Sequence, residues 1–429
     1  MNEARHQAYQ NLIDSLLTCD REERMGIMQA NLELIDEGFA QFLRRDWATQ
    51  TLAKLQGEEA SNCAINLFNF NLGFYSLRQG SRASNLEVAI ACLEIGLTII
   101  TRKADSKNWA MFQNSLGIKY YDRIRGGKAE NLELAIAAYQ ASLEIYTRDA
   151  FPFEWAGSQN NLANAYQYRI RGEKAQNLEL AIAAFEASLE IWTRDAFPFE
   201  WATCQNNLAG AYLYRIRGEK AQNLELAIAA LEASLEVCTR DAFPEDWAMS
   251  QNNLASAYYS RIRGEKAENL ELAIAALEAS LEVYTRDAFP FEWARSQNNL
   301  GLAYHNRIRG EKAENLEGAI AAYLASLEIY TQLIWHPWRF TPATHFPKTG
   351  QGVKIIWRMP TSTELEGKKQ RISKPRSQLL RHPWKFGPAT HFPKTGQGVK
   401  IIWRLPTSIE SEGRKPRIWN WRSQLLRQP

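Results

Sequence analysis

Apolar residues in the middle of the chain form two alternating helical patterns. From Glu154 to Arg169, and again from Asn177 to Thr193, apolar side chains recur at the spacing that places them on one stripe of a helix. The loop 171–174 interrupts the pattern, and Pro198 prevents the second helix from continuing. The sequence therefore predicts a pair of helices in each unit, here called helix A and helix B.

This two-helix unit repeats with a period of 46 residues. A more divergent pair precedes the regular ones, with Leu72-Gly73 and Tyr75 in its helix A and Asn85 at the start of its helix B. A single pair cannot bury two apolar stripes, whereas stacked pairs share a continuous core. The predicted fold class is therefore all-α, a solenoid of helical hairpins. The period is seen in the tryptophans Trp109, Trp155, Trp201, Trp247 and Trp293.

The period divides the chain into three segments. Residues 1–60 contain separate helical patterns and are predicted to form an N-terminal helical cap, and residues 61–331 form six helix pairs. Residues 332–429 lack a consistent apolar period and are predicted to be irregular and disordered. In each pair, an asparagine side chain is expected to cap the start of helix B. These caps are Asn131, Asn177, Asn223, Asn269 and Asn315.

The helix pairs resemble the tetratricopeptide repeat. Leu162-Ala163 with Tyr166 in helix A, and Ala181 with Phe185 in helix B, match its pattern, although the standard repeat has only about 34 residues. The recurring motifs QNNLA and RIRG, and the opening Met1-Asn2-Glu3-Ala4-Arg5, are also similar to bacterial, typically cyanobacterial, repeat proteins that often end in a caspase-like CHAT protease domain. The resemblance implies a scaffold that binds a peptide or protein partner on the concave face, which helices A line.

Polar side chains of helix A form two columns of carboxamides with the same period. Such a ladder donates and accepts hydrogen bonds, and can hold a peptide backbone without reading its sequence. It resembles the asparagine ladder of kinesin-light-chain-type repeats; an equally consistent interpretation is that the asparagines bridge neighbouring helices. The predicted partner-binding residues are Asn114, Asn160, Asn206, Asn252 and Asn298, with Gln159, Gln205, Gln251 and Gln297, a column that Gln113 extends.

Other repeated positions are expected to have structural or selective roles. The tryptophan column is expected to pack at the pair junctions, and arginines at the helix A ends are expected to be offset by helix B glutamates such as Glu179. One turn beyond the carboxamides the side chains differ between units, which is expected to supply partner selectivity. This variable column contains Asn164, Gly210, Ser256 and Leu302.

Charge separates the array from the tail. Residues 1–331 carry 32 Lys/Arg and 44 Asp/Glu, whereas residues 332–429 carry 19 and 4. Eleven of the 15 prolines also lie in the tail. Basic residues interleaved with tryptophans are typical of segments that bind nucleic acid, so a nucleic-acid-associated protein is the alternative function. The acidic array disfavours nucleic acid as its partner.

The tail repeats with the period of the array although its residues are unrelated. His336-Pro337-Trp338 recurs 46 residues later as His382-Pro383-Trp384. Residues 391–403 of the tail read HFPKTGQGVKIIW. Codons can be chosen for this segment such that the neighbouring reading frame encodes AFPQDWARSQNNL. This closely matches AFPEDWAMSQNNL, which the array has at 242–254. The tail is therefore expected to be an out-of-frame translation of further repeats that begins after Thr331. A further alternative is that the chain is the product of a decayed gene for a tetratricopeptide-repeat (TPR) protein with a CHAT protease domain.

Neither catalytic nor cofactor chemistry is expected. The sequence has no HExxH, P-loop or GxSxG motif, and no cysteine after Cys238 to serve as a CHAT nucleophile. The five cysteines include no CxxC pair and are expected to be reduced in a cytoplasmic protein. No apolar stretch is long enough for a membrane span. We expect no enzyme activity, cofactor, metal or small-molecule substrate.

Overall fold

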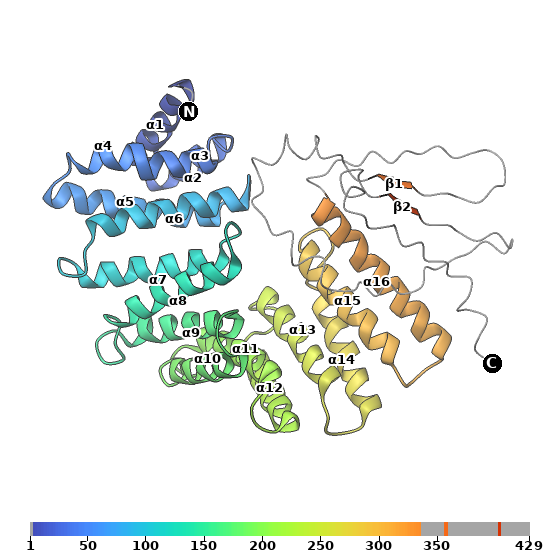
Figure 1. The fold of residues 1–429 in the computed structure, drawn as a ribbon. Coiled ribbons are helices and arrows are strands. Elements are labelled where there is room, and N and C mark those ends of the chain that lie inside the picture. Colours follow the sequence, from blue (N-terminus) through green and yellow to red (C-terminus); the bar gives the residue numbers. More distant parts are fainter. Residues whose placement is uncertain (1–2, 336–355, 359–401, 405–429) are drawn as a thin grey trace, which may run out of the picture. The chain divides into compact units, whose positions relative to one another are not determined.

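The computed structural model describes residues 3–335, 356–358 and 402–404. Its contacts divide the chain into two compact units, Met1–Leu333 and Ile334–Pro429. In the first unit every described element is a helix, and the helices follow one another as stacked hairpins (Figure 1). The prediction of an all-α array with a 46-residue repeat is confirmed. The predicted disorder of the tail concerns residues that lie largely outside the described ones.

Four short helices and one π-helical segment form the N-terminal cap, with a core of fully buried rings that includes Tyr9, Phe39 and Trp47. The side chain of Asp36 caps one of these helices by accepting from the backbone amide of Phe39 at 2.8 Å. The elements are α1 (Glu3–Thr18), α2 (Arg21–Ala30), α3 (Glu37–Phe42), the π-helix η1 (Leu43–Trp47) and α4 (Ala48–Leu52).

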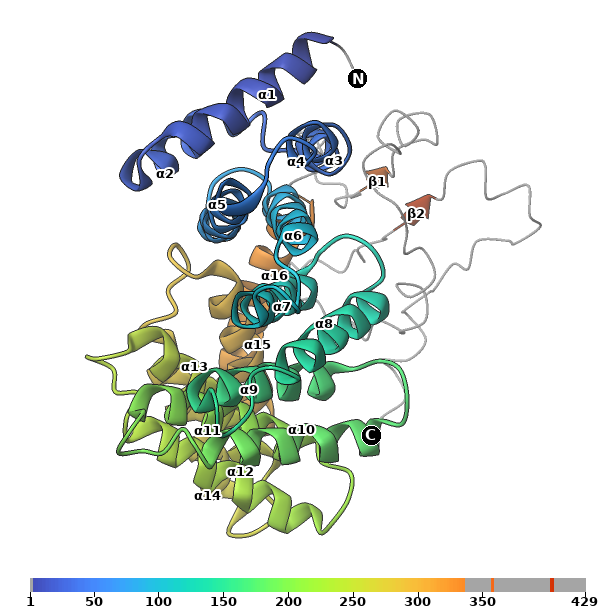
Figure 2. The ribbon, with the colours of Figure 1, turned by 90° about the vertical axis from the view of Figure 1, so that its left-hand side faces the viewer.

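Six helix pairs follow the cap, and Figure 2 shows the first four of them, α5 to α12, stacked pair upon pair. Each helix A packs against its own helix B and against helix B of the preceding pair. Successive helices A also approach one another more closely than successive helices B, as expected when helices A line the concave side. The pairs are α5 (Gly57–Ser76) with α6 (Arg82–Ile99), α7 (Ser106–Asp122) with α8 (Lys128–Leu143), α9 (Pro152–Tyr168) with α10 (Lys174–Leu189), α11 (Pro198–Tyr214) with α12 (Lys220–Leu235), α13 (Pro244–Ser260) with α14 (Lys266–Leu281), and α15 (Pro290–Asn306) with α16 (Lys312–Trp335).

Proline and glycine set the ends of each hairpin. Pro198 is the first residue of α11, where its missing amide proton costs no hydrogen bond and its φ suits a helix. The loop between α9 and α10 turns at Gly172, whose φ of +77° is unfavourable for residues with a side chain. The same positive φ recurs in the corresponding loop of every pair.

The predicted asparagine cap of helix B is wrong in position and in role. α10 begins at Lys174, so Asn177 lies inside its first turn. The Asn177 side chain is buried, and its Nδ2 donates to the carbonyl of Arg171 at 2.8 Å. The amide therefore closes the loop between the two helices. The predicted end at Thr193 is also late, because α10 stops at Leu189 and Thr193 Oγ1 accepts from Ala196 in the following turn.

The Leu72-Gly73 motif of the first pair does not pack like the corresponding motif of the regular pairs. Leu72 is 46% exposed. Phe70 lies one period before Leu116 and is fully buried. The apparent Leu-Gly match was misleading because Gly73 instead gives room for Met28 of the cap, whose Cε lies 2.9 Å from where a Cβ at Gly73 would be.

The last helix and the second unit depart from the repeat. α16 continues to Trp335, whereas the other regular helices B end before an Arg-Asp-Ala-Phe-Pro turn. The residues Gln332 to Trp335 contain neither the aspartate nor the proline of that turn, so nothing in the local sequence stops the helix. In the second unit, the three-residue strands β1 (Ile356–Arg358) and β2 (Ile402–Arg404) pair in parallel.

Loss of the loop-closing amide should destabilise a hairpin. We expect Asn177→Ala to lower the free energy of unfolding by about 1–2 kcal/mol, because a buried donor and its bond to the Arg171 carbonyl are removed. Urea unfolding followed by circular dichroism measures this change. The neighbouring exposed residue provides the control: Gln176→Ala should leave the midpoint unchanged, and equal midpoints for both variants would contradict the assigned role.

Candidate partner-binding surface

A bidentate ion pair joins each helix pair to the next. Arg215 follows α11 directly, and its Nε and Nη2 donate to Glu179 of α10 at 2.9 and 2.7 Å. Both oxygens of the carboxylate are engaged, which fixes the orientation of the two planar groups. The same pair occurs at all five junctions between the six pairs: Arg123–Glu87, Arg169–Glu133, Arg215–Glu179, Arg261–Glu225 and Arg307–Glu271.

A tyrosine makes a second polar contact across the same junctions. The hydroxyl of Tyr212 donates to Glu186 at 3.0 Å, and Tyr258 and Tyr304 bond to Glu232 and Glu278 in the same way. The prediction that helix B glutamates offset the arginines is confirmed in detail for Glu179. The sequence signal for this partner was the constant separation of 36 residues between each arginine and its glutamate.

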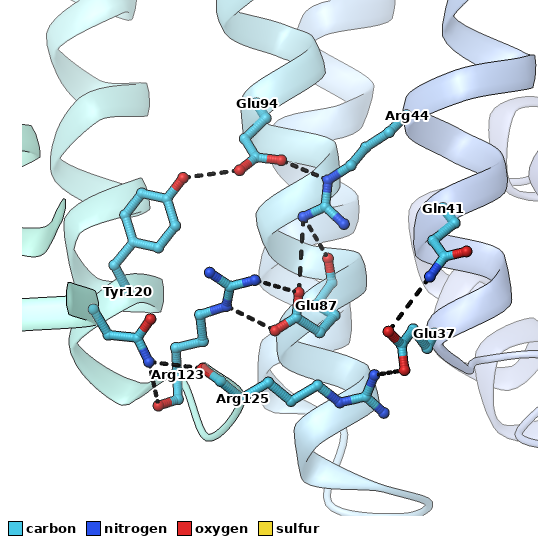
Figure 3. A network of polar contacts seen from close by, with 9 residues as sticks. Glu37, Gln41, Arg44, Glu87, Glu94, Tyr120, Arg123 and Arg125 are labelled. Atoms are coloured by element: carbon cyan, nitrogen blue, oxygen red, sulfur yellow. Dashed lines mark hydrogen bonds and ion pairs between the residues drawn. The ribbon is translucent and has the colours of Figure 1, made fainter. Parts of the chain in front are cut away.

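The cap uses the same acceptors as the regular junctions (Figure 3). Glu87 and Glu94 of α6 accept from Arg123 and Tyr120 of the second pair, at 2.7 and 2.8 Å. Arg44 of the cap reaches the same α6 carboxylates, with its Nε 2.6 Å from Glu94. Sequence reasoning did not identify this contact, because Arg44 lies outside the 46-residue period.

The asparagine column lies at the pair junctions. Asn160, Asn206 and Asn252 are buried, with 8%, 4% and 2% of their surface exposed. Asn206 Oδ1 accepts from Asn253 at 3.0 Å and from Ser250 at 3.3 Å, both on the next helix A. This geometry matches the bridging interpretation. A partner peptide has no access to these three carboxamides while the junctions are closed.

The remaining predicted residues are accessible. Asn114 is half-buried, accepting from Asn161 at 3.3 Å, and Asn298 in the last pair is exposed. The glutamines Gln113, Gln159, Gln205, Gln251 and Gln297 are half-buried and make no side-chain hydrogen bond in the part of the chain that the structure describes. Their carboxamides retain free donors and acceptors, so a role in partner binding stays a prediction.

The solvent-facing side of helices A, here called the helix A face, carries residues that differ between pairs. Tyr168 and Tyr214 at the ends of α9 and α11 are 52% and 66% exposed, and the corresponding residue of α13 is Ser260. The variable column borders them, with Asn164, Gly210 and Ser256 half-buried and Leu302 38% exposed. Exposed aromatic rings are the side chains that most often anchor a protein partner.

The tryptophan column and two cysteines have packing roles. Trp155 and its sister Trp201 are half-buried, and Trp155 packs against the core. The guanidinium of Arg194 lies over the Trp201 ring at 5.8 Å. Cys204 and Cys238 are buried as core residues, and burial raises the pKa of Cys204 to about 12, so its thiol stays protonated at neutral pH.

The fold and its repeated junction define an array protein built of helical hairpins. A family model described as tetratricopeptide repeat matches residues 247–285, which include most of α13 and all of α14. Residues 247–285 therefore match a tetratricopeptide repeat, and repeats of this kind generally mediate protein–protein interactions. No curated protein matches the chain in a sequence search.

Among the described residues, no helix is both long and apolar enough to cross a membrane. No group of three or more histidine, cysteine or acidic side chains in the same part of the chain could hold a metal ion.

The junction ion pairs should make the stability of the array depend on acid. Hydrogen bonds from Arg215 lower the pKa of Glu179 below its ordinary value of 4.5, and the same holds for Glu133, Glu225 and Glu271. A carboxylate with a lowered pKa in the folded state stabilises the fold above its unfolded pKa, and this stabilisation is lost as pH falls through the folded pKa. We therefore expect the urea midpoint to fall below about pH 4.5.

The junction contribution is isolated by substitution. Glu179→Gln should lower the midpoint at pH 7 and reduce the difference between pH 7 and pH 3. Glu173→Gln, at an exposed position in the preceding loop, is the control and should preserve the wild-type profile. If Glu179→Gln keeps the full acid dependence, the bidentate pair does not contribute to it.

Proposed function

We propose that the array is a scaffold that binds a peptide or protein on the helix A face, and that it acts by binding and not by catalysis. The observation that carries this proposal is the contrast between constant junctions and variable exposed positions. The arginine–glutamate and asparagine–asparagine contacts of the junctions are the same in successive pairs, whereas the exposed end of helix A is Tyr168, Tyr214, Ser260 or Asn306. Constant junctions keep the helices A in a regular row, and the variable residues then give each position along the row its own chemistry.

The free carboxamides beside these residues support the same surface. Gln159, Gln205 and Gln251 have unused hydrogen-bonding capacity in the described structure, which suits the backbone of an extended peptide. Tyr168 and Tyr214 offer aromatic surface for apolar side chains of that peptide. All five cysteines are free thiols and four are buried, which suits the reducing environment of the cytoplasm.

We further propose that residues 332–429 are translated out of frame from repeats that once extended the array. The identical tripeptides at 356–358 and 402–404, one period apart, support this view, as does the change of residues after Thr331. The repeats resemble those of TPR–CHAT proteins, so the parent gene would have encoded a CHAT protease domain. Sequencing the gene across codon 331 tests the frame: without a near-duplicate of about eleven codons, the proposal fails.

The binding surface is tested by selecting peptides from a random phage-displayed library on the full chain. Tyr214→Ser is the informative variant, because Ser260 occupies the same position in α13 and the substitution should not disturb folding. We expect Tyr214→Ser to weaken a selected peptide roughly tenfold, since loss of a central aromatic contact costs more than 1 kcal/mol. Isothermal titration calorimetry measures the Kd.

The matched control lies on helix B. Leu226 is 37% exposed and, as a residue of the helix B α12, is not part of the helix A face. Leu226→Ala should leave the Kd unchanged. Peptides that respond to Leu226→Ala and not to Tyr214→Ser would place the binding surface on helices B and refute the proposal.

A further inference from the structure

The end of the array formed by α15 and α16 carries a junction acceptor without its donor. Glu317 lies one period after Glu271, and each of its five sisters accepts both hydrogen bonds of an arginine. Glu317 makes neither a hydrogen bond nor an ion pair within the described residues, and it is exposed, whereas the Glu271 side chain is only 25% exposed. A carboxylate placed to receive a guanidinium is therefore open to solvent.

The asparagine contact is open at the same end. Asn252, on helix A of the fifth pair, is 2% exposed because it accepts from Asn299 at 3.1 Å and donates to Ser296. Asn298 is the same residue of the sixth pair, and it is exposed. The last pair thus presents the hydrogen-bond acceptors of a junction, Glu317 and Asn298. Among the described residues, no further helix A donates to them.

Apolar surface accompanies these polar groups. Leu302, Leu324 and Leu327 are 38%, 53% and 49% exposed. Leu324 takes the place of Glu278, the residue that accepts the hydroxyl of Tyr304 at the preceding junction. An incoming ring would meet an apolar side chain there, so this end favours phenylalanine or leucine over tyrosine at that position.

We propose that this end face, defined by Asn298, Leu302, Glu317, Leu324 and Leu327, binds a helical hairpin of the same repeat type carried by another polypeptide. The incoming helix A must have an arginine directly after its last turn, to reach Glu317. It must also have an asparagine two turns earlier, to donate to Asn298. Both requirements follow from Arg307 and Asn299, which make these contacts at the preceding junction. This face shares Leu302 and Asn298 with the last helix A, but it does not include Tyr168 or Tyr214, so the two proposals can be tested separately.

A second copy of this chain does not fit the requirement. The junction arginines of α7, α9, α11, α13 and α15 are each bound to a glutamate of their own chain. The cap covers the first pair, where Arg44 contacts the acceptors of α6. Among the described residues, no helix A of a folded copy is free to dock, so the occupant is a chain whose first hairpin is uncapped.

The probe for this site is a synthetic peptide with the sequence of residues 244–285 and the substitution Tyr258→Phe, which contains the required Arg261 and Asn253 and no cysteine. Binding of the fluorescently labelled peptide to the full chain is measured by anisotropy. We expect saturable binding that Glu317→Arg weakens at least tenfold. Glu314→Arg, an equal charge change at an exposed residue of the same helix, should leave the Kd unchanged.

A charge exchange completes the test. A peptide carrying Arg261→Glu should bind wild type weakly and should recover affinity for the Glu317→Arg chain, because the ion pair is restored in the opposite sense. Three results would overturn the proposal: no saturable binding below about 100 μM, equal effects of Glu317→Arg and Glu314→Arg, or loss of binding with Tyr214→Ser. A concentration-dependent dimer that Glu317→Arg abolishes in analytical ultracentrifugation would assign the face to a second copy, which also overturns it.

Discussion

Neighbouring helix pairs depend on one another for stability. A hairpin has apolar residues on both sides, so an isolated hairpin exposes an apolar side to solvent. The junction between pairs therefore holds the array together. It combines the apolar core with two polar contacts, the bidentate pair exemplified by Arg215 and Glu179 and the asparagine contact exemplified by Asn253 and Asn206. Apolar packing supplies most of the stability, and the directional polar contacts set the rotation of each helix A against the previous pair.

A constant junction leaves only certain positions free to differ. Side chains that point toward a neighbouring pair have partners at fixed distances, so a change there affects folding. Tyr214 on the helix A face makes no hydrogen bond to a neighbouring pair among the described residues, and its position differs from pair to pair. The division explains how an array of nearly identical units can present a surface whose chemistry changes along its length.

The same constraint acts at both ends of the array. At the N-terminal end, Arg44 of the cap occupies acceptors on α6, and apolar rings of the cap cover the first pair. At the other end, Glu317 and Asn298 present the receiving half of a junction without the incoming helix among the described residues. The two ends are therefore chemically unlike, and only the second has the groups with which a further hairpin can pair.

Much of the architecture was readable from the period of the sequence. Helical spacing, loop glycines and prolines predicted the helices, and their repetition after 46 residues predicted stacked hairpins, because these signals are local and recur in each unit. The role of Asn177 could not be predicted from the local sequence. A polar residue at a helix start suggested a cap, but the loop folds back so that its amide donates to the Arg171 carbonyl. Similarly, Leu72 matched a local motif while packing against the cap placed Phe70 in the core.

The sequence by itself determined the repeat, the helices and the set of residues that recur. Only the tertiary structure decided which recurring residues face a neighbour and which face solvent. The carboxamides show the difference: Asn206 and Gln205 are adjacent and equally periodic, yet one is buried in a junction and the other retains free hydrogen-bonding groups. Periodicity records that a position is equivalent in each unit, whereas its accessibility depends on how one unit is rotated against the next.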